Sequence, residues 1–126
     1  MIEVILDQGA KKNELLISFT NKYNKVCFID HMRVFKNERY TVACLDIYDL
    51  AGEKISRLKH LRLRAPQFPD DYLKLEAGQT YLASLDLNKH FKIETNEIIV
   101  QYNCYNSSPI SEERQKMSSN KITMCM

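Results

Sequence analysis

Hydrophobic and polar residues alternate with a period of two along several stretches of the chain. Residues 14–20 place alternate apolar side chains, from Leu15 to Phe19, on one face of an extended segment and mainly polar side chains on the other. Residues 41–49 and 97–104 repeat this alternation and are rich in β-branched and aromatic residues. Such a period is typical of strands that bury one face. The pattern therefore predicts β-strands rather than helices.

Turn signals separate these stretches into short elements. Gly52 and Gly78 each follow an alanine between strand-like runs, where glycine supplies the positive φ that many turns need. We expect strands near residues 2–6, 14–20, 25–31, 41–49, 53–63, 72–76, 80–87, 97–104 and 119–125. No segment shows the amphipathic crossover helix that a parallel sheet requires. The prediction is one all-β domain over residues 1–126, an antiparallel immunoglobulin-like β-sandwich of about seven to nine strands.

Two proline-containing segments interrupt this pattern. Pro66 and Pro69 each remove a backbone donor, which predicts an extended crossing between sheets. The polar segment 106–119 predicts a long loop, in which Pro109 permits at most one short helix near 109–116. A loop of this length is either functional or simply mobile.

The composition is that of an ordinary globular domain. The chain has 126 residues, of which 44% are hydrophobic and 27% charged, and its formal net charge is +2. So small a charge gives no reason to expect a nucleic-acid partner. No apolar run is long enough to span a membrane, and the N-terminus lacks a signal-peptide pattern. We expect a cytoplasmic protein, or a periplasmic or secreted one if a leader was removed.

Residue spacings that accompany catalysis or metal binding are absent from the sequence. His31, His60 and His90 lie far apart, and no HExxH or CxxC motif brings two metal ligands together. There is no GxSxG motif and no glycine-rich phosphate loop. We therefore expect no metal, no cofactor and no enzymatic activity.

The number of cysteines is even, and all of them lie in strand-like runs: Cys27, Cys44, Cys104 and Cys125. Two bridges in an oxidising compartment and four reduced thiols are both compatible with this arrangement. If residues 25–31 and 41–49 form a hairpin, Cys27 lies opposite Cys44, within reach of a disulfide. We expect no comparable pairing of Cys104 with Cys125.

One segment concentrates basic side chains between leucines and isoleucine. The basic residues are Lys54, Arg57, Lys59, Arg62 and Arg64. They form either a surface for an acidic partner or the solvated side of an edge strand, where charge prevents sheet-to-sheet association. Asp70 and Asp71 follow closely, so a local ion pair with Arg64 is expected.

Several sequence blocks follow one another in a characteristic order. They are LLISFTN at 15–21, LDIYDLAGEK at 45–54, RAPQFPDDYLKLEAGQTYLASLDLNKHF at 64–91, and KITMCM at 121–126. In this order they resemble the immunoglobulin-like domain found as the N-terminal or propeptide region of deuterolysin-type zinc endopeptidases, and as free-standing bacterial proteins. The peptidase part, with its zinc ligands, is not in this sequence, so no catalytic residue carries over.

The resemblance implies a non-catalytic binding module, either a propeptide-like inhibitor or an immunity partner of a metallopeptidase. The alternative is a structural or adhesion-type module without a peptidase partner. The long polar loop and the end of the basic segment are the features that folding explains least. We therefore expect a protein partner, and the residues expected to contact it are Arg62, Arg64, Ile110, Glu112, Glu113, Arg114 and Met117. The sequence leads to no expectation about the oligomeric state.

Overall fold

The computed structural model describes residues 1–58 and 64–126, in which strands predominate. The strands are β1 (Ile2–Gln8), β2 (Glu14–Asn21), β3 (Cys27–Asp30), β4 (Leu45–Asp49), β5 (Tyr72–Leu75), β6 (Thr80–Asp86), β7 (Glu97–Ser107) and β8 (Arg114–Cys125). Two short 3-10 turns, η1 (Lys36–Glu38) and η2 (Leu87–Lys89), are the helical elements in these ranges. Neither is of a length that crosses a bilayer. The expected all-β class is confirmed.

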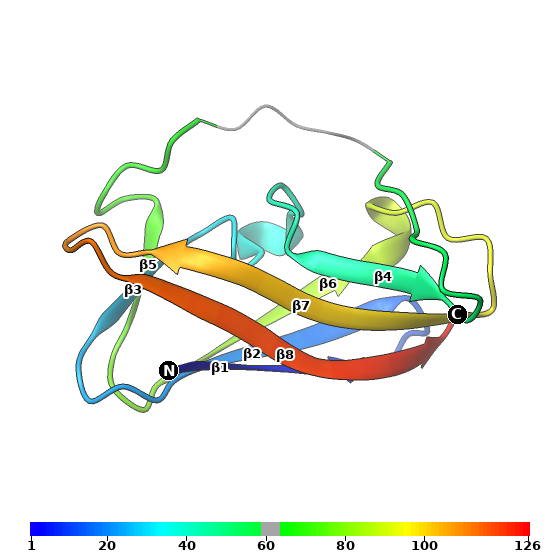
Figure 1. The fold of residues 1–126 in the computed structure, drawn as a ribbon, viewed down its shortest axis with the longest axis horizontal. Helices are drawn as coiled ribbons and strands as arrows, with labels where there is room; N and C mark the ends of the chain where they lie inside the picture. Colours follow the sequence, from blue (N-terminus) through cyan, green and yellow to red (C-terminus); the bar gives the residue numbers. More distant parts are fainter. Residues whose placement is uncertain (59–63) are drawn as a thin grey trace.

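A six-stranded sheet with the order β4-β7-β8-β1-β2-β6 forms most of the structure, and β3 and β5 form a separate pair (Figure 1). All strand pairs are antiparallel except β1 with β8, which run parallel through Val4 and Ser119. The sheet is therefore mixed, and the expectation of a wholly antiparallel arrangement is corrected at this one junction. Here Leu6 donates its amide to Oδ1 of Asn120 at 2.8 Å, and Nδ2 of Asn120 donates to the Leu6 carbonyl at 3.2 Å.

The six-stranded sheet folds over on itself to enclose the core. The rings of Phe19 on β2 and Tyr102 on β7 lie 5.5 Å apart, although β8 and β1 separate these strands in the sheet. In a flat sheet, strands three positions apart would be roughly 14 Å from each other. The β4-β7-β8 half therefore lies opposite the β1-β2-β6 half, and their inward side chains form a sandwich-like core. Phe35, from the connection after β3, packs against both rings.

The β3–β5 pair closes one end of this core. Cys27, Ile29 and Leu75 point inward from it and are buried. The turn between β5 and β6 contains Gly78 at φ 79°, and the turn after β4 contains Gly52 at φ 89°, so both predicted glycine turns are confirmed.

Several predicted elements differ from the observed ones. Residues 106–119 belong mostly to β7 and β8, and the hairpin tip comprises only residues 108–113, with no helix near 109–116. Of the predicted strand 53–63, residues 53–58 form two isolated bridges, while 59–63 lie outside the described residues.

Candidate functional site

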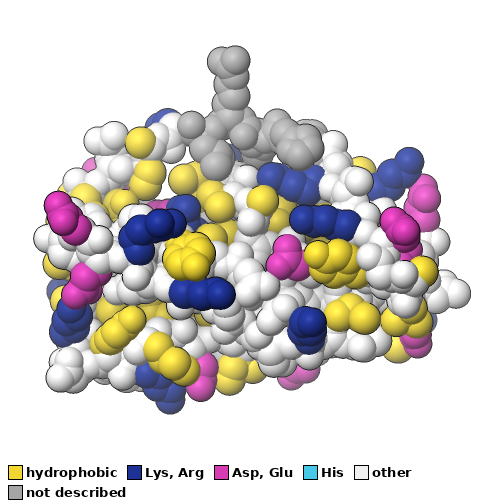
Figure 2. All heavy atoms as spheres, viewed as in Figure 1, with side chains coloured by type: hydrophobic (Ala, Val, Ile, Leu, Met, Phe, Trp, Pro, Cys, Tyr) yellow, Lys and Arg dark blue, Asp and Glu magenta, His cyan; other side chains and the backbone are white. Residues whose placement is uncertain are grey.

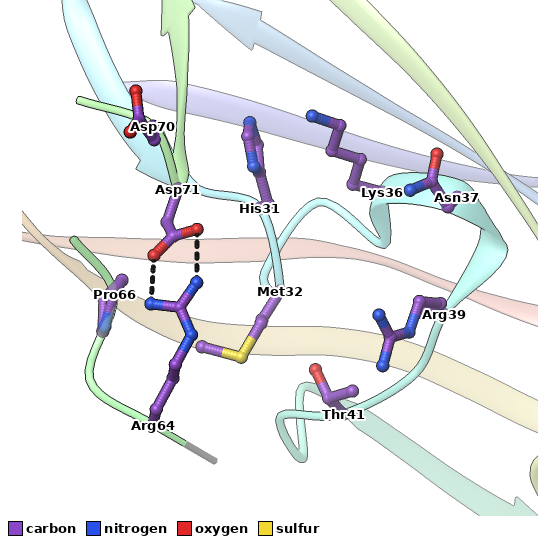
Figure 3. A pocket seen from close by; sticks show the side chains of 10 residues that line it. All are labelled: His31, Met32, Lys36, Asn37, Arg39, Thr41, Arg64, Pro66, Asp70 and Asp71. Carbon is purple, nitrogen blue, oxygen red and sulfur yellow. Dashed lines mark hydrogen bonds and ion pairs between the residues drawn. The ribbon is translucent and has the colours of Figure 1, made fainter. Parts of the chain in front are cut away.

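A pocket of about 630 Å³ opens between the connection that follows β3 and the segment that precedes β5 (Figure 3). Basic side chains outnumber acidic ones in its wall. The lining residues are His31, Met32, Lys36, Asn37, Arg39, Thr41, Arg64, Pro66, Asp70 and Asp71. We call this the cationic pocket.

Asp30, at the end of β3, directs the chain into the first wall of the pocket. Its Oδ1 accepts hydrogen bonds from the amides of Met32 and Arg33 at 3.0 and 3.1 Å, and its Oδ2 pairs with the Arg33 guanidinium. These bonds bend the backbone immediately after the strand, as an aspartate commonly does in turns. The His31 amide donates to the Asp71 carbonyl at 2.8 Å, which connects the two walls.

The tightest part of this wall is built from left-handed residues. Phe35, Asn37 and Glu38 have φ values of 54°, 59° and 57°. A left-handed residue other than glycine costs about 1–2 kcal/mol, although asparagine tolerates the conformation better. The packing of Phe35 in the core holds the turn in place. Backbone strain of this kind concentrates at binding sites, which makes the turn a functional candidate.

Two cations at this turn are available to a ligand. Within the described ranges, neither Lys36 nor Arg39 lies within ion-pair distance of a carboxylate. Arg64 differs, because its guanidinium donates to both oxygens of Asp71 at 2.6 and 2.9 Å. The expected local ion pair is thus confirmed, and the hydrogen bonds from Arg64 lower the pKa of Asp71.

Thr41 adds a buried polar group to the lining of the pocket. Its side chain is 7% exposed, and its Oγ1 has no hydrogen-bond partner among the residues that the structure describes. A buried hydroxyl without a partner costs roughly 1–3 kcal/mol, so a ligand that bonds to it gains this energy. Burial lowers the pKa of His31, which favours the neutral form of the ring. The combination of Lys36, Arg39 and Thr41 is suited to binding an anionic group.

One exposed and two half-buried aromatic residues lie beside the cationic pocket. Phe68 is 45% exposed, and its ring lies edge-on to Phe28 at 5.0 Å and to Tyr72 at 5.8 Å. We call these three residues the aromatic ladder. A groove shared by Phe28 and Ile110 joins the ladder to the hairpin tip, which lies at the same end of the molecule as β3 and β5 in Figure 1. Aromatic and arginine side chains are enriched in protein interfaces.

The residues expected to contact a partner are distributed over several places. Arg62 lies outside the described residues, and Arg64 lines the cationic pocket. Ile110 and Glu112 are exposed at the hairpin tip, where Glu113 pairs with Lys25 at 3.1 Å. The contact of each of these residues with a partner stays a prediction.

Arg114 and Met117 have different environments although both lie on β8. The Arg114 guanidinium stacks over Tyr105 at 4.8 Å. Figure 2 shows basic and hydrophobic side chains interleaved on one face of the molecule, viewed as in Figure 1. Met117 is 0% exposed, because the hairpin continues as a strand and turns this residue into the core. Its inclusion among the contact residues is therefore wrong.

The cysteine pairing differs from the sequence-based expectation. Cys27 on β3 lies opposite Leu75 of β5, and Cys44 immediately precedes β4, which pairs with β7. The expected hairpin between residues 25–31 and 41–49 is therefore wrong, and Cys27 and Cys44 are not strand partners. The Sγ atom of Cys44 lies 3.0 Å from that of Cys104 instead.

The sequence reasoning missed Lys36, Arg39 and Thr41. The available signal was the charged run Lys36–Arg39 between two strand-like stretches, which interrupts the alternating pattern. This run lines a pocket only together with Arg64 and Asp71, which are remote in the sequence. The spacing of residues along the chain therefore does not predict the pocket.

A scan against protein-family models and a search of curated proteins each find no match for the chain. The chemistry of the pocket and its surroundings is therefore the basis for a functional proposal.

Proposed function

We propose that this protein is a non-catalytic binding module that places an acidic side chain of a protein partner in the cationic pocket. The observation that carries the proposal is the position of Lys36 and Arg39, two cations without a carboxylate partner in the described structure, beside the unbonded Thr41 hydroxyl. The planar guanidinium of Arg39 suits a carboxylate, since two parallel N–H groups match its two oxygens.

The aromatic ladder would supply the apolar part of the same contact. Phe68 and Tyr72 flank the segment that carries Asp71, so a partner residue beside the acidic one can pack on their rings. Interfaces commonly gain most of their affinity from a few aromatic and arginine residues around a desolvated centre. The strands behind these segments give them a fixed frame, as in other loop-based binding sites.

In its finer form, the proposal names a zinc metallopeptidase as the partner, which the protein inhibits as a propeptide does or binds as an immunity protein. This form is supported by the sequence resemblance and is compatible with an all-β sandwich-like fold. In this form of the proposal, the inhibitory segment is the hairpin tip at 108–113 rather than the whole of 106–119, because the flanking residues belong to β7 and β8. Ile110, 62% exposed at that tip, is the residue available to enter a cleft.

The second candidate is a structural or adhesion-type module. It is favoured by exposed apolar side chains on the outer face of the β1-β2-β6 half. The strand register places Ile5 beside Ser18 and Ser18 beside Leu82, with Leu16 diagonal to both apolar residues. An apolar group on a solvent-facing sheet is typical of a contact with another protein surface.

Fluorescence anisotropy with labelled peptides tests the binding proposal. The probes are glutamate-containing peptides with an adjacent phenylalanine and matched peptides in which glutamine replaces glutamate. We expect the acidic peptides to bind better, and Arg39→Glu to weaken that binding about tenfold or more. Lys92→Glu is the matched control, since Lys92 pairs with Glu94 away from the pocket lining. Equal binding of both peptide sets, or no effect of Arg39→Glu, contradicts the proposal.

Casein hydrolysis by a purified deuterolysin-type peptidase tests the finer form. Inhibition by the wild-type protein that is lost when Ile110 is changed to Asp supports a metallopeptidase partner. Selective binding of acidic peptides without inhibition retains the binding module and rejects that partner.

A further inference from the structure

Cys44 and Cys104 come together from distant parts of the sequence. They are 60 residues apart, and their Sγ atoms lie 3.0 Å from each other. The Asn103 amide donates to the Cys44 carbonyl at 2.8 Å, so a backbone hydrogen bond holds the two segments together beside the sulfur atoms. A disulfide has an S–S distance of about 2.0 Å, which requires an approach of about 1 Å.

The two thiols differ in accessibility. Cys44 is 1% exposed, whereas Cys104 is only partly buried and can be reached from solvent. The Cys44 thiol donates its hydrogen bond to Cys104, and this bond, with the nearby positive charge of Arg33, lowers the pKa of Cys104. The same bond and burial raise the pKa of Cys44. Thiolates are the reactive form, so Cys104 is the group that reacts first.

We propose that Cys44 and Cys104 form an oxidisable dithiol, a modification site at which a small-molecule disulfide of the glutathione type closes a bridge between the residue that precedes β4 and β7. The inference rests on the juxtaposition of the two sulfur atoms and is independent of the proposed binding function.

The reaction proceeds by two thiol–disulfide exchanges. The Cys104 thiolate attacks one sulfur of glutathione disulfide, the S–S bond of the oxidant breaks, and one glutathione thiolate leaves. The Cys44 thiol then attacks the Cys104 sulfur of the mixed disulfide, and its proton passes to the departing glutathione sulfur. The Cys44–Cys104 bond forms as the second glutathione leaves. Two protein thiols are oxidised, and one glutathione disulfide is reduced to two glutathione molecules.

The bridge would restrain the connection that forms the first wall of the cationic pocket. Thr41 and Arg39 lie shortly before Cys44, and oxidation would fasten the end of this connection to β7. Cross-linking residues far apart in sequence stabilises a protein mainly by restricting its unfolded chain. The midpoint of thermal unfolding should therefore rise by roughly 5–15 °C on oxidation.

Redox titration of the full chain in glutathione buffers, followed by acid quenching and mass spectrometry, tests the proposal. We expect an intact mass lower by about 2 Da and one cross-linked peptide pair, joining Cys44 to Cys104. Cys44→Ser should trap a glutathione adduct on Cys104. Cys125→Ser is the matched control, because Cys125 lies on the opposite part of β8 from Met117, the strand partner of Cys104, and should leave the bridge intact.

The wild-type peptide map requires no variant to fold and is therefore decisive. A bridge that contains Cys27 or Cys125, or two free thiols at positions 44 and 104 in excess glutathione disulfide, overturns the proposal. A 44–104 bridge that leaves the midpoint of thermal unfolding unchanged overturns the predicted restraint.

Discussion

The carboxamide of Asn21 is fully buried and joins three segments of the chain. Its Nδ2 donates to the carbonyls of Lys25 at 2.8 Å and Leu75 at 2.9 Å, and its Oδ1 accepts from the Tyr23 amide at 2.9 Å. The end of β2, the following turn and β5 are therefore held by one side chain. This contact gives a physical reason for an asparagine at the end of the alternating run 15–21.

Changing Asn21 to Asp should lower the free energy of unfolding by about 2–4 kcal/mol. The change places a carboxylate oxygen against two carbonyl oxygens, where an amide now donates, and buries a charge without a partner. Urea unfolding at pH 7 measures the difference. Asn24→Asp is the matched control, because Asn24 is exposed in the same turn. Equal losses in the two variants would show that the Asn21 hydrogen bonds do not hold the turn.

Among the elements, the junction of β1 with β8 depends most on a single side chain. The strands share one register pair, and Asn120 supplies the bonds that a neighbouring peptide group would otherwise make to Leu6. The side-chain carboxamide of Asn120 thus extends the parallel pairing at the corner where the sheet folds over.

Asn120→Ala should weaken this corner without unfolding the protein. Loss of both bonds to Leu6 should cost about 1–2 kcal/mol, since the freed backbone groups are only partly accessible to water. Hydrogen exchange followed by NMR should show faster exchange of the Leu6 amide, whereas the amides in the β2–β6 pairing change little. Lys121→Ala, at an exposed neighbouring position, is the control. Unchanged protection of Leu6 would contradict the role given to Asn120.

The sequence predicts individual strands better than their partners. The alternation around Leu15 and Phe19 identified β2 and its buried face, because that information is local. The register shift between Gln101 and Asn103 places an extra residue in β8, so that the buried positions of β8 change from the odd-numbered Gln115 and Met117 to the even-numbered Met124. Such a bulge, and the pairing of β3 with β5, depend on contacts between distant residues.

The cationic pocket could not be predicted from local sequence patterns, for a related reason. Phe35 and Glu38 adopt left-handed conformations although neither is a glycine, so their residue types do not predict the turn. The packing of Phe35 in the core imposes this conformation, and that packing exists only in the folded protein. By contrast, the Arg64–Asp71 pair was predictable, because both residues belong to one short segment.

At the scale of the whole molecule, the two described histidines link stability to pH. Burial lowers the pKa values of His31 and His90. Below about pH 6.5, an unfolded histidine therefore binds protons that the folded one resists. Stability should fall as the pH decreases from 7 to 5. The depressed pKa of Asp71 acts in a separate and more acidic range.

The double change His31→Gln and His90→Gln should flatten the pH dependence of stability between pH 7 and 5. The wild-type urea midpoint should decrease over this range, and the midpoint of the variant should decrease less. His60 is present in both proteins and therefore does not distinguish them. Parallel pH profiles would show that these two rings do not contribute.

The adjacency of β1 and β8 also constrains how the chain acquires its structure during synthesis. Leu6 is translated 114 residues before its partner Asn120. At ordinary rates of translation, this separation corresponds to roughly 6–23 s. In that interval β1 and β2 can pair, but the outer edge of β1 remains open to other chains. A chain stalled before β8 should therefore be recognised by chaperones and prone to aggregate, whereas release of the last strand completes the sheet.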